Sequence, residues 1–509
     1  MNGSALVKLL GVVVLVAASF FAGMYLYTPE QTVSTNPIFR GGEGAGSLAG
    51  SQARQGEIHE VREGQLIQDA VIAAKAGDTI LVYPGTYSET VYVDKENITL
   101  SGVVEKGKWP ELDGKGELND AILYSGNGFL VENFKIRRFK GNGIMGQSGN
   151  NFVIRNNIIH DAGVYGIFPQ LGVNGLVVNN VISKIADAAI YVGMSDNIDV
   201  IGNQVFDSVA GIEIENSRHS LVEGNYTYNN TGGILAFITP GLPIKTTYDV
   251  IIRKNFVLNN NHPNFAAPGS TVSRIPPGTG ILVMAADDVV IEDNIISGND
   301  NAGIVVTDLA MAKAAHDPGS EPNPDNLVIL NNIMTDNGSN PVGEMKTMNA
   351  TGIDIVDTGA GSNKCILNAS RYNTLLLPPS RYGQCDEAKF ATHDINTKTL
   401  DKPAPATVYE GATKENWEQR VGKRGYFAIC TGCHAYQGVL IGPSVKDIQD
   451  KYAPLGAEGI ELVSDYIAEP FKIREEFHEM PPQRHLDEDT RLAIAKYILK
   501  VSNDPNKKK

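Results

Sequence analysis

The chain has 509 residues, of which 42% are hydrophobic and 20% are charged, so a folded protein of two or three domains is expected. Its formal net charge of −15 disfavours binding to the phosphates of nucleic acids, and no nucleic-acid partner is predicted.

The amino terminus contains an apolar run at residues 9–27, preceded by Lys8. Its length suits a single membrane-spanning helix, and Lys8 favours a cytoplasmic amino terminus. We therefore predict an uncleaved anchor (1–28) in a bacterial inner membrane and a flexible tether (29–56), with the rest of the chain in the periplasm. The alternative is a cleaved signal peptide and a soluble periplasmic or secreted protein.

The middle of the chain repeats a short phrase that ends in asparagine. The first well-aligned copies end 23, 23 and 22 residues apart, at Asn157, Asn180, Asn203 and Asn225. A Gly-Ile or Ala-Ile pair follows each asparagine by about ten residues. Short alternating β runs of this period bury their apolar side only when the coils stack. We expect the isoleucines to point inward and the asparagines to occupy left-handed turns, with side chains bonded to the next coil.

These repeats resemble the right-handed parallel β-helix proteins of the pectate-lyase-like superfamily, over residues 57–390. The resemblance implies an all-β solenoid with a short capping helix near residues 65–75. It implies no single function, because this fold carries lyases, hydrolases, epimerases and inactive binding modules.

One outward face of the predicted solenoid carries Glu213 and Glu215, with Tyr191 one coil earlier. Paired carboxylates and a tyrosine can transfer protons on a sugar, so these residues are weak catalytic candidates. The alternative is that the glutamates are merely solvated outward residues. Long inserts at 238–249, 259–279 and 307–325 are expected to crowd on one side. They could wall a sugar cleft, dock a partner or dock the carboxy-terminal domain.

Cys365 and Cys385 lie at the end of the repeats, 20 residues apart. In an oxidising compartment they are predicted to form a disulfide that closes the last coil, with two free thiols as the alternative. A linker follows at residues 391–414.

The motif Cys430-Thr-Gly-Cys433-His434 is the attachment signature of a c-type haem. Each thiol adds to one haem vinyl group, and His434 can reach the iron. A zinc site would need two further ligands at matching spacing.

Residues 415–503 resemble the small class I cytochromes c, an all-α fold that carries one covalent haem c. By this resemblance, Gly422 lies where the first helix of this domain closely crosses the last helix (487–501). The Pro443 carbonyl would accept a hydrogen bond from His434. Met480 would be the second iron ligand. Its alternatives are a core-filling methionine or ligation by His478 or His485. A basic tail (504–509) ends the chain.

The sequence therefore predicts a membrane-tethered, periplasmic monohaem cytochrome that transfers single electrons to or from a redox partner. Its β-helix would dock that partner or bind a glycan. The alternatives are a polysaccharide lyase or epimerase with an accessory cytochrome, and a β-helix that is only a spacer. Whether the chain is an enzyme stays open.

Overall fold

The computed structural model describes residues 56–314, 317–378, 381–385, 442–471 and 488–500, with single positions or short runs at 418, 422, 425–430, 433, 434, 477, 480, 482, 483 and 486. The predicted anchor, most of the tether, the linker and the basic tail lie outside these residues. None of the described helices combines the length and the apolar character needed to cross a membrane.

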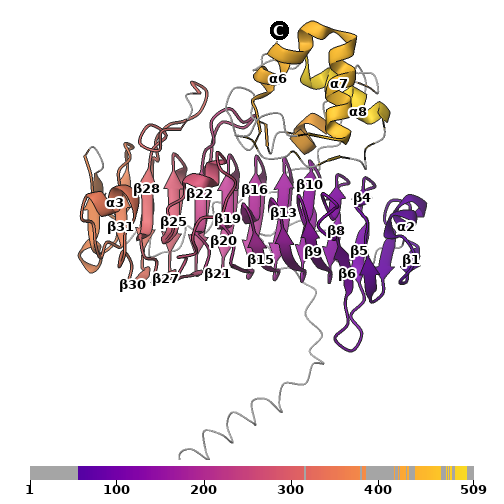
Figure 1. Cartoon of the computed structure of the whole chain (residues 1–509). Helices are drawn as coiled ribbons and strands as arrows, with labels where there is room; N and C mark the ends of the chain where they lie inside the picture. The colour runs from indigo at the N-terminus through magenta and orange to yellow at the C-terminus, as the bar shows by residue number, and fades with distance from the viewer. Residues whose placement is uncertain are drawn as a thin grey trace, which may run out of the picture. The chain divides into compact units, whose positions relative to one another are not determined.

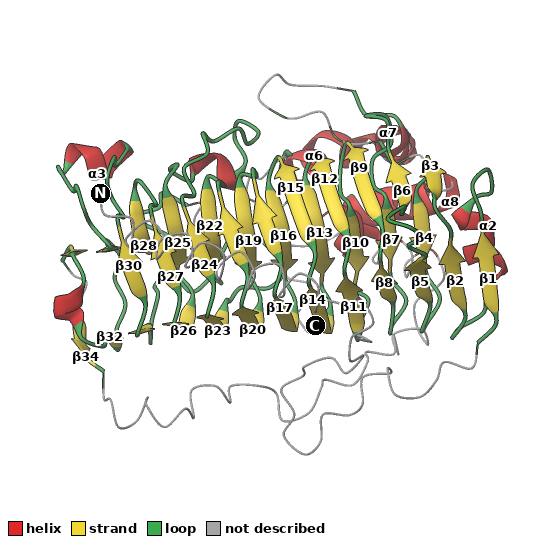
Figure 2. Cartoon of the chain, turned by 90° about the horizontal axis from the view of Figure 1, so that it is seen from below, coloured by secondary structure: helices red, strands yellow, loops and turns green. Residues whose placement is uncertain are grey.

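Three parallel β-sheets run through residues 58–384, and most coils contribute one strand to each sheet (Figures 1 and 2). In the described residues the first sheet has 13 strands: β1 (Ile58–Val61), β2 (Thr79–Val82), β5 (Thr99–Gly102), β8 (Leu130–Glu132), β11 (Phe152–Arg155), β14 (Val173–Val178), β17 (Asp196–Ile201), β20 (Arg218–Glu223), β23 (Tyr248–Arg253), β26 (Asp287–Glu292), β29 (Val328–Leu330), β32 (Lys364–Ile366) and β34 (Tyr382–Gln384). The second sheet, which carries the candidate face, has 11 strands in the described part: β4 (Val91–Val93), β7 (Ile122–Tyr124), β10 (Ile144–Gln147), β13 (Tyr165–Gln170), β16 (Ala188–Gly193), β19 (Ala210–Glu215), β22 (Gly232–Phe237), β25 (Thr279–Met284), β28 (Ala302–Thr307), β31 (Ile355–Asp357) and β33 (Thr374–Leu376). The third has 10 described strands: β3 (Gly85–Tyr87), β6 (Pro110–Asp113), β9 (Lys135–Phe139), β12 (Ile158–Ala162), β15 (Val181–Ile185), β18 (Gln204–Phe206), β21 (Tyr226–Tyr228), β24 (Phe256–Leu258), β27 (Ile295–Ser297) and β30 (Ile333–Thr335). The predicted parallel β-helix is confirmed.

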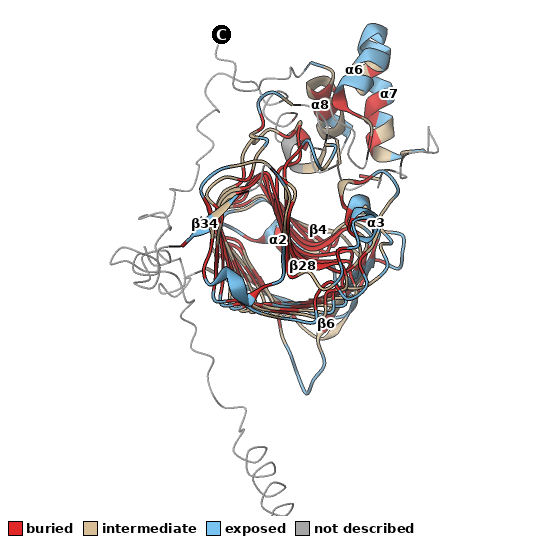
Figure 3. Cartoon of the chain, turned by 90° about the vertical axis from the view of Figure 1, so that its left-hand side faces the viewer, coloured by how far each residue is buried: buried red, intermediate tan, exposed pale blue. Residues whose placement is uncertain are grey.

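The hydrophobic core fills the inside of the coils, where apolar side chains from all three sheets meet. Figure 3 looks along the solenoid and shows that many residues of its strands are buried. The predicted isoleucine ladder is present: Ile144 pairs with Ile167, and Ile167 with Ile190, all fully buried. The last rung differs from the prediction, because Ile304 pairs with Ile355 rather than Ile353. The capping helix near residues 65–75 is also present, as α2 (Ile67–Ala73).

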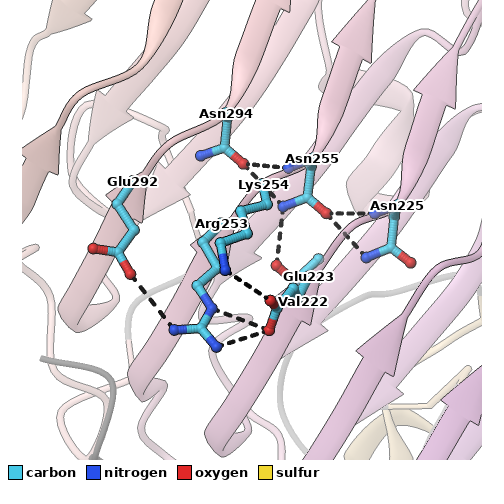
Figure 4. Close-up of polar contacts among 8 residues, drawn as sticks. All are labelled: Val222, Glu223, Asn225, Arg253, Lys254, Asn255, Glu292 and Asn294. Carbon is cyan, nitrogen blue, oxygen red and sulfur yellow. Dashed lines mark hydrogen bonds and ion pairs between the residues drawn. The ribbon is translucent and has the colours of Figure 1, made fainter. Parts of the chain in front are cut away.

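The repeated asparagines form a buried ladder along the solenoid (Figure 4). The Asn255 side-chain oxygen accepts the backbone and side-chain N–H groups of Asn225, at 2.9 and 3.0 Å, and Asn294 does the same for Asn255. The predicted bond to the next coil is confirmed. The predicted left-handed turn is one residue too late, because the preceding residues, such as Asn156 and Asn179, take φ near 55°. The repeated asparagine turns inward instead, where its amide satisfies buried backbone groups.

The remaining described elements are short helices. Some belong to the carboxy-terminal half of the solenoid and the others to the carboxy-terminal segment. They are η1 (Thr271–Arg274), α3 (Gly343–Thr347), η2 (Ala369–Arg371), the π-helical turn η5 (Tyr426–Cys430), α6 (Val445–Tyr452), η6 (Ala453–Leu455), α7 (Ala457–Ala468) and α8 (Glu488–Ile498). The carboxy-terminal helices bury Tyr426, Val445, Val463 and Ile494 in a small core of their own. A Cβ added at Gly422 would lie 2.2 Å from the Ala493 carbonyl oxygen, so this glycine permits the predicted close approach to the last helix.

Candidate functional site

His434 is held in one orientation by the segment that follows it. Its Nδ1 lies 2.7 Å from the Pro443 carbonyl oxygen, as predicted. A carbonyl oxygen only accepts, so Nδ1 carries the proton and Nε2 keeps a free lone pair. Burial lowers the pKa of His434, against the opposing effect of the Pro443 bond. The ring is therefore a neutral imidazole with Nε2 available as a metal ligand.

The two motif cysteines lie on the turn that leads into His434. The backbone N–H groups of Cys433 and His434 both donate to the Cys430 carbonyl, at 3.1 and 2.9 Å. Both thiols are free, and burial raises the pKa of each to about 12. Among the described residues, no group of three metal-ligand side chains includes these cysteines.

A cavity of about 510 Å³ brings the predicted haem residues together. Its walls include Cys430, Cys433, His434 and Met480. Much of the remaining lining from the carboxy-terminal segment is apolar: Ile429, Val445, Ile448, Val463, Ile467, Ile494 and Ile498. A largely apolar cavity with two thiols, an imidazole and a thioether fits the donor set of a c-type haem. The alternative ligands His478 and His485 lie outside the described residues.

The weak catalytic candidates are buried rather than solvated. Tyr191, Glu213 and Glu215 are 1%, 2% and 7% exposed, so the solvated interpretation of the glutamates is wrong. Residues of the inserts, among them Ile238 and Ile275, pack over this part of the second sheet and exclude water. A polysaccharide chain cannot reach the carboxylates in this arrangement.

Asp187 belongs to the same buried cluster as the two glutamates, and the sequence alone did not indicate this. Burial, and then the charges of Asp187 and Glu215, raise the pKa of Glu213 well above its usual range. Burial raises the pKa of Glu215, and the neighbouring hydroxyl groups of Thr239 and Tyr191 oppose this shift. The Glu213 Oε1 atom has no partner among the described residues. The only signal for Asp187 was its position directly before β16, which registers with β19.

The inserts crowd together over the second sheet, as predicted. Lys245 of the first insert forms a 2.6 Å ion pair with Asp317 of the third, and Arg274 of the second donates to the Lys313 carbonyl. Together with α3 they enclose a second cavity of about 420 Å³. Its floor is apolar, which the prediction of a sugar cleft did not anticipate.

A potential metal-ligand group at the start of the solenoid has a structural role. Glu57, His59 and Asp78 lie close together. Asp78 accepts hydrogen bonds from the Lys75 and Glu57 backbones and contacts His59 Nε2 at 2.9 Å. The Lys75 bond is the main cause of an Asp78 pKa of about 2. These bonds fasten β1 to the next coil.

The carboxy-terminal end of the solenoid is cross-linked. Cys365 and Cys385 form the predicted disulfide, with Cα atoms 5.1 Å apart. Beside it, the fully buried Lys364 forms a 2.8 Å ion pair with Asp357 and donates to the Ala360 carbonyl. Both contacts hold the last coils together.

The chain is similar to known proteins in two comparisons, with solved structures and with family models. Solved structures of similar fold include the A-module of the mannuronan C-5 epimerase AlgE4 from Azotobacter vinelandii, at 15% identity with a TM-score of 0.41, which covers 65% of this chain and 90% of that one. An alginate lyase from Paenibacillus sp. str. FPU-7 matches at 15% identity and a TM-score of 0.43, over 56% and 98% of the two chains. No curated protein matches the chain. The family model described as "right handed beta helix region" matches residues 60–205 and 175–377, which is more than half of the chain. The chain belongs to the right-handed β-helix family.

Proposed function

We infer that the carboxy-terminal segment is a monohaem c-type cytochrome and that the chain transfers single electrons. The observation that carries this proposal is the shared cavity of Cys430, Cys433, His434 and Met480, with His434 already oriented by Pro443. A bound haem c supplies reversible one-electron chemistry.

The residues of the cavity have separate tasks in this proposal. Cys430 and Cys433 would hold the haem covalently through their thiols, and His434 Nε2 and the Met480 sulfur would ligate its iron. The Pro443 carbonyl fixes the histidine ring and raises its basicity as a ligand. The apolar walls exclude water, and a thioether ligand favours the reduced iron.

The setting of this activity is proposed as the periplasmic face of a bacterial inner membrane, with residues 1–28 as the anchor. The Cys365–Cys385 disulfide supports an oxidising compartment. The electron partner is proposed to be a periplasmic redox protein, with a polysaccharide as a further partner of the β-helix.

Met480 provides the test of the ligand set. Met480→Ala should lower the midpoint potential and change the reduced spectrum, because the thioether that would ligate the iron is lost. Met348→Ala, which removes an exposed methionine of the β-helix, is the control and should change neither. An unchanged potential and spectrum in Met480→Ala would show that another residue ligates the iron.

A polysaccharide lyase or epimerase is the second candidate. The observation that favours it is the cluster of Asp187, Glu213 and Glu215, because carboxyl groups with raised pKa values gather at active sites. Protonated carboxyls could act as general acids once the covering inserts move. The whole chain should be assayed on polyuronates for unsaturated or epimerised products. Activity that disappears in Glu213→Gln combined with Glu215→Gln would establish this candidate, and its absence in the wild type would exclude it for these substrates.

A further inference from the structure

The second cavity lies over the carboxy-terminal half of the second sheet. Its floor consists of side chains on neighbouring strands, with Leu282 in register with Leu235 on one side and Val305 on the other. Val356 continues the row on β31. Leu282 and Val305 are only half-buried, although both are flanked by buried residues on their strands. The floor therefore presents an apolar surface to the cavity.

The walls of the cavity are also apolar and come from three separate segments. Val272 and Ile275 of the second insert form one wall, and Met345 of α3 forms another. Met311 of the third insert forms the remaining wall. Met311 is 47% exposed. Methionine side chains adapt to ligands of different shape because they are flexible and polarizable. A cavity of about 420 Å³ is in the size range of small-molecule sites, and smaller than a protein partner needs.

Three polar side chains that line the cavity are already engaged. The Thr358 hydroxyl donates to that of Thr307 at 3.0 Å, and the Asn301 side-chain oxygen accepts the Val342 backbone N–H. These groups are thus already partly engaged with each other or with the backbone. A sugar would bury many hydroxyls against them without enough partners, which is unfavourable.

Arg274 brings a positive charge to this apolar cavity. Its Nη1 donates to the Lys313 carbonyl at 3.4 Å, and it forms no ion pair with any carboxylate among the described residues. Glu344, which also lines the cavity, pairs with Lys313 at 3.5 Å instead. The Arg274 side chain is exposed and carries its positive charge at the lining of this cavity, in a chain of net charge −15. Its planar fork matches a carboxylate.

We propose that this cavity binds a medium-chain carboxylic acid. The hydrocarbon chain lies over Leu282 and Val305, where it removes apolar surface from water, and the carboxylate pairs with Arg274. This binding site is additional to the proposed electron transfer and does not depend on it.

Photoaffinity labelling of the whole chain tests this proposal. A dodecanoate that carries a diazirine on its alkyl chain should label peptides that contain the cavity-lining residues of β25, β28 and the second insert. Unlabelled dodecanoate should compete more strongly than dodecanol, because only the acid can pair with Arg274.

Three variants make the test specific to the cavity. Arg274→Gln should weaken competition by dodecanoate on the order of tenfold to a hundredfold and leave dodecanol unchanged. Val305→Phe should abolish labelling by filling the cavity, with circular dichroism as the check that the coil is intact. Arg371→Gln, an exposed arginine outside the cavity, should have no effect. Labelling elsewhere on the chain, equal competition by acid and alcohol, or full labelling of Val305→Phe would each overturn the proposal.

Discussion

The His434 ring owes its position to a glycine as much as to its hydrogen bond with Pro443. A Cβ added at Gly442 would lie 2.4 Å from His434 Cε1 and 2.8 Å from Nδ1. A hydrogen atom at this position therefore lets the backbone pass directly beside the imidazole.

Gly442→Ala should displace the His434 ring and disturb its ligation. We expect a lower haem content or a shifted midpoint potential, measured by haem absorbance and redox titration. Gly319→Ala is the matched control, because its Cβ would meet nothing nearer than 3.5 Å. A wild-type spectrum and potential in Gly442→Ala would contradict this account of the ring's orientation.

Two aspartates of the solenoid should give opposite pH dependence of stability. Burial raises the Asp287 pKa to about 6, whereas Lys245 helps to lower the Asp317 pKa to about 2, against burial. The stabilising contribution of Asp287 is present below about pH 4 and is lost as the pH rises through about 6. The stabilising contribution of Asp317 is present above about pH 4 and is lost as the pH falls through about 2.

Thermal unfolding across pH tests this pair. At pH 7, Asp287→Asn should stabilise the protein and Asp317→Asn should destabilise it, each by about 1 kcal/mol after allowance for solvent screening. The Asp287→Asn difference should vanish near pH 4. If both variants changed the unfolding temperature in the same direction and by the same amount at all pH values, the charge effects assigned to Asp287 and Asp317 would be wrong.

At the scale of elements, the asparagine ladder is the main set of polar side-chain contacts between successive coils. Asn255 is 1% exposed, receives two hydrogen bonds from Asn225 and donates from its side chain to the Val222 carbonyl at 2.9 Å. Each rung thus satisfies groups of its neighbours on both sides, so the loss of one rung leaves buried N–H groups without partners.

Asn255→Ala should cost about 3 kcal/mol of unfolding free energy, because it leaves the Asn225 backbone and side-chain N–H groups unsatisfied. Asn340→Ala, at an exposed asparagine, should change stability by less than about 0.5 kcal/mol. Chemical denaturation measures both. Equal effects of the two substitutions would mean that the ladder does not stabilise the solenoid.

The sequence predicted the stacked coils because their period shows directly in the repeated asparagine and isoleucine. It misplaced the left-handed turn by one residue, since both a turn and a buried ladder select asparagine. It also predicted the His434–Pro443 contact, the approach at Gly422 and the disulfide. It did not reveal the burial of Glu213 and Glu215, because the inserts that cover them come from later coils and follow no repeat.

At the scale of the whole molecule, a right-handed β-helix and a haem-attachment motif occur in one chain. Each coil of the solenoid is bonded to the next through its backbone and its asparagines, and its last coils are cross-linked. A scaffold with these bonds between its coils suits a binding surface better than a moving part. The proposed division of work is therefore binding on the solenoid and electron transfer in the carboxy-terminal segment.

Covalent haem attachment tests this central claim most directly. The chain should be produced in a bacterial periplasm with c-type haem maturation, and its intact mass should be measured after denaturation. We predict a mass gain of one haem per chain, which the double variant Cys430→Ser with Cys433→Ser loses. A wild-type chain without added haem, or a double variant that keeps it, would contradict the account.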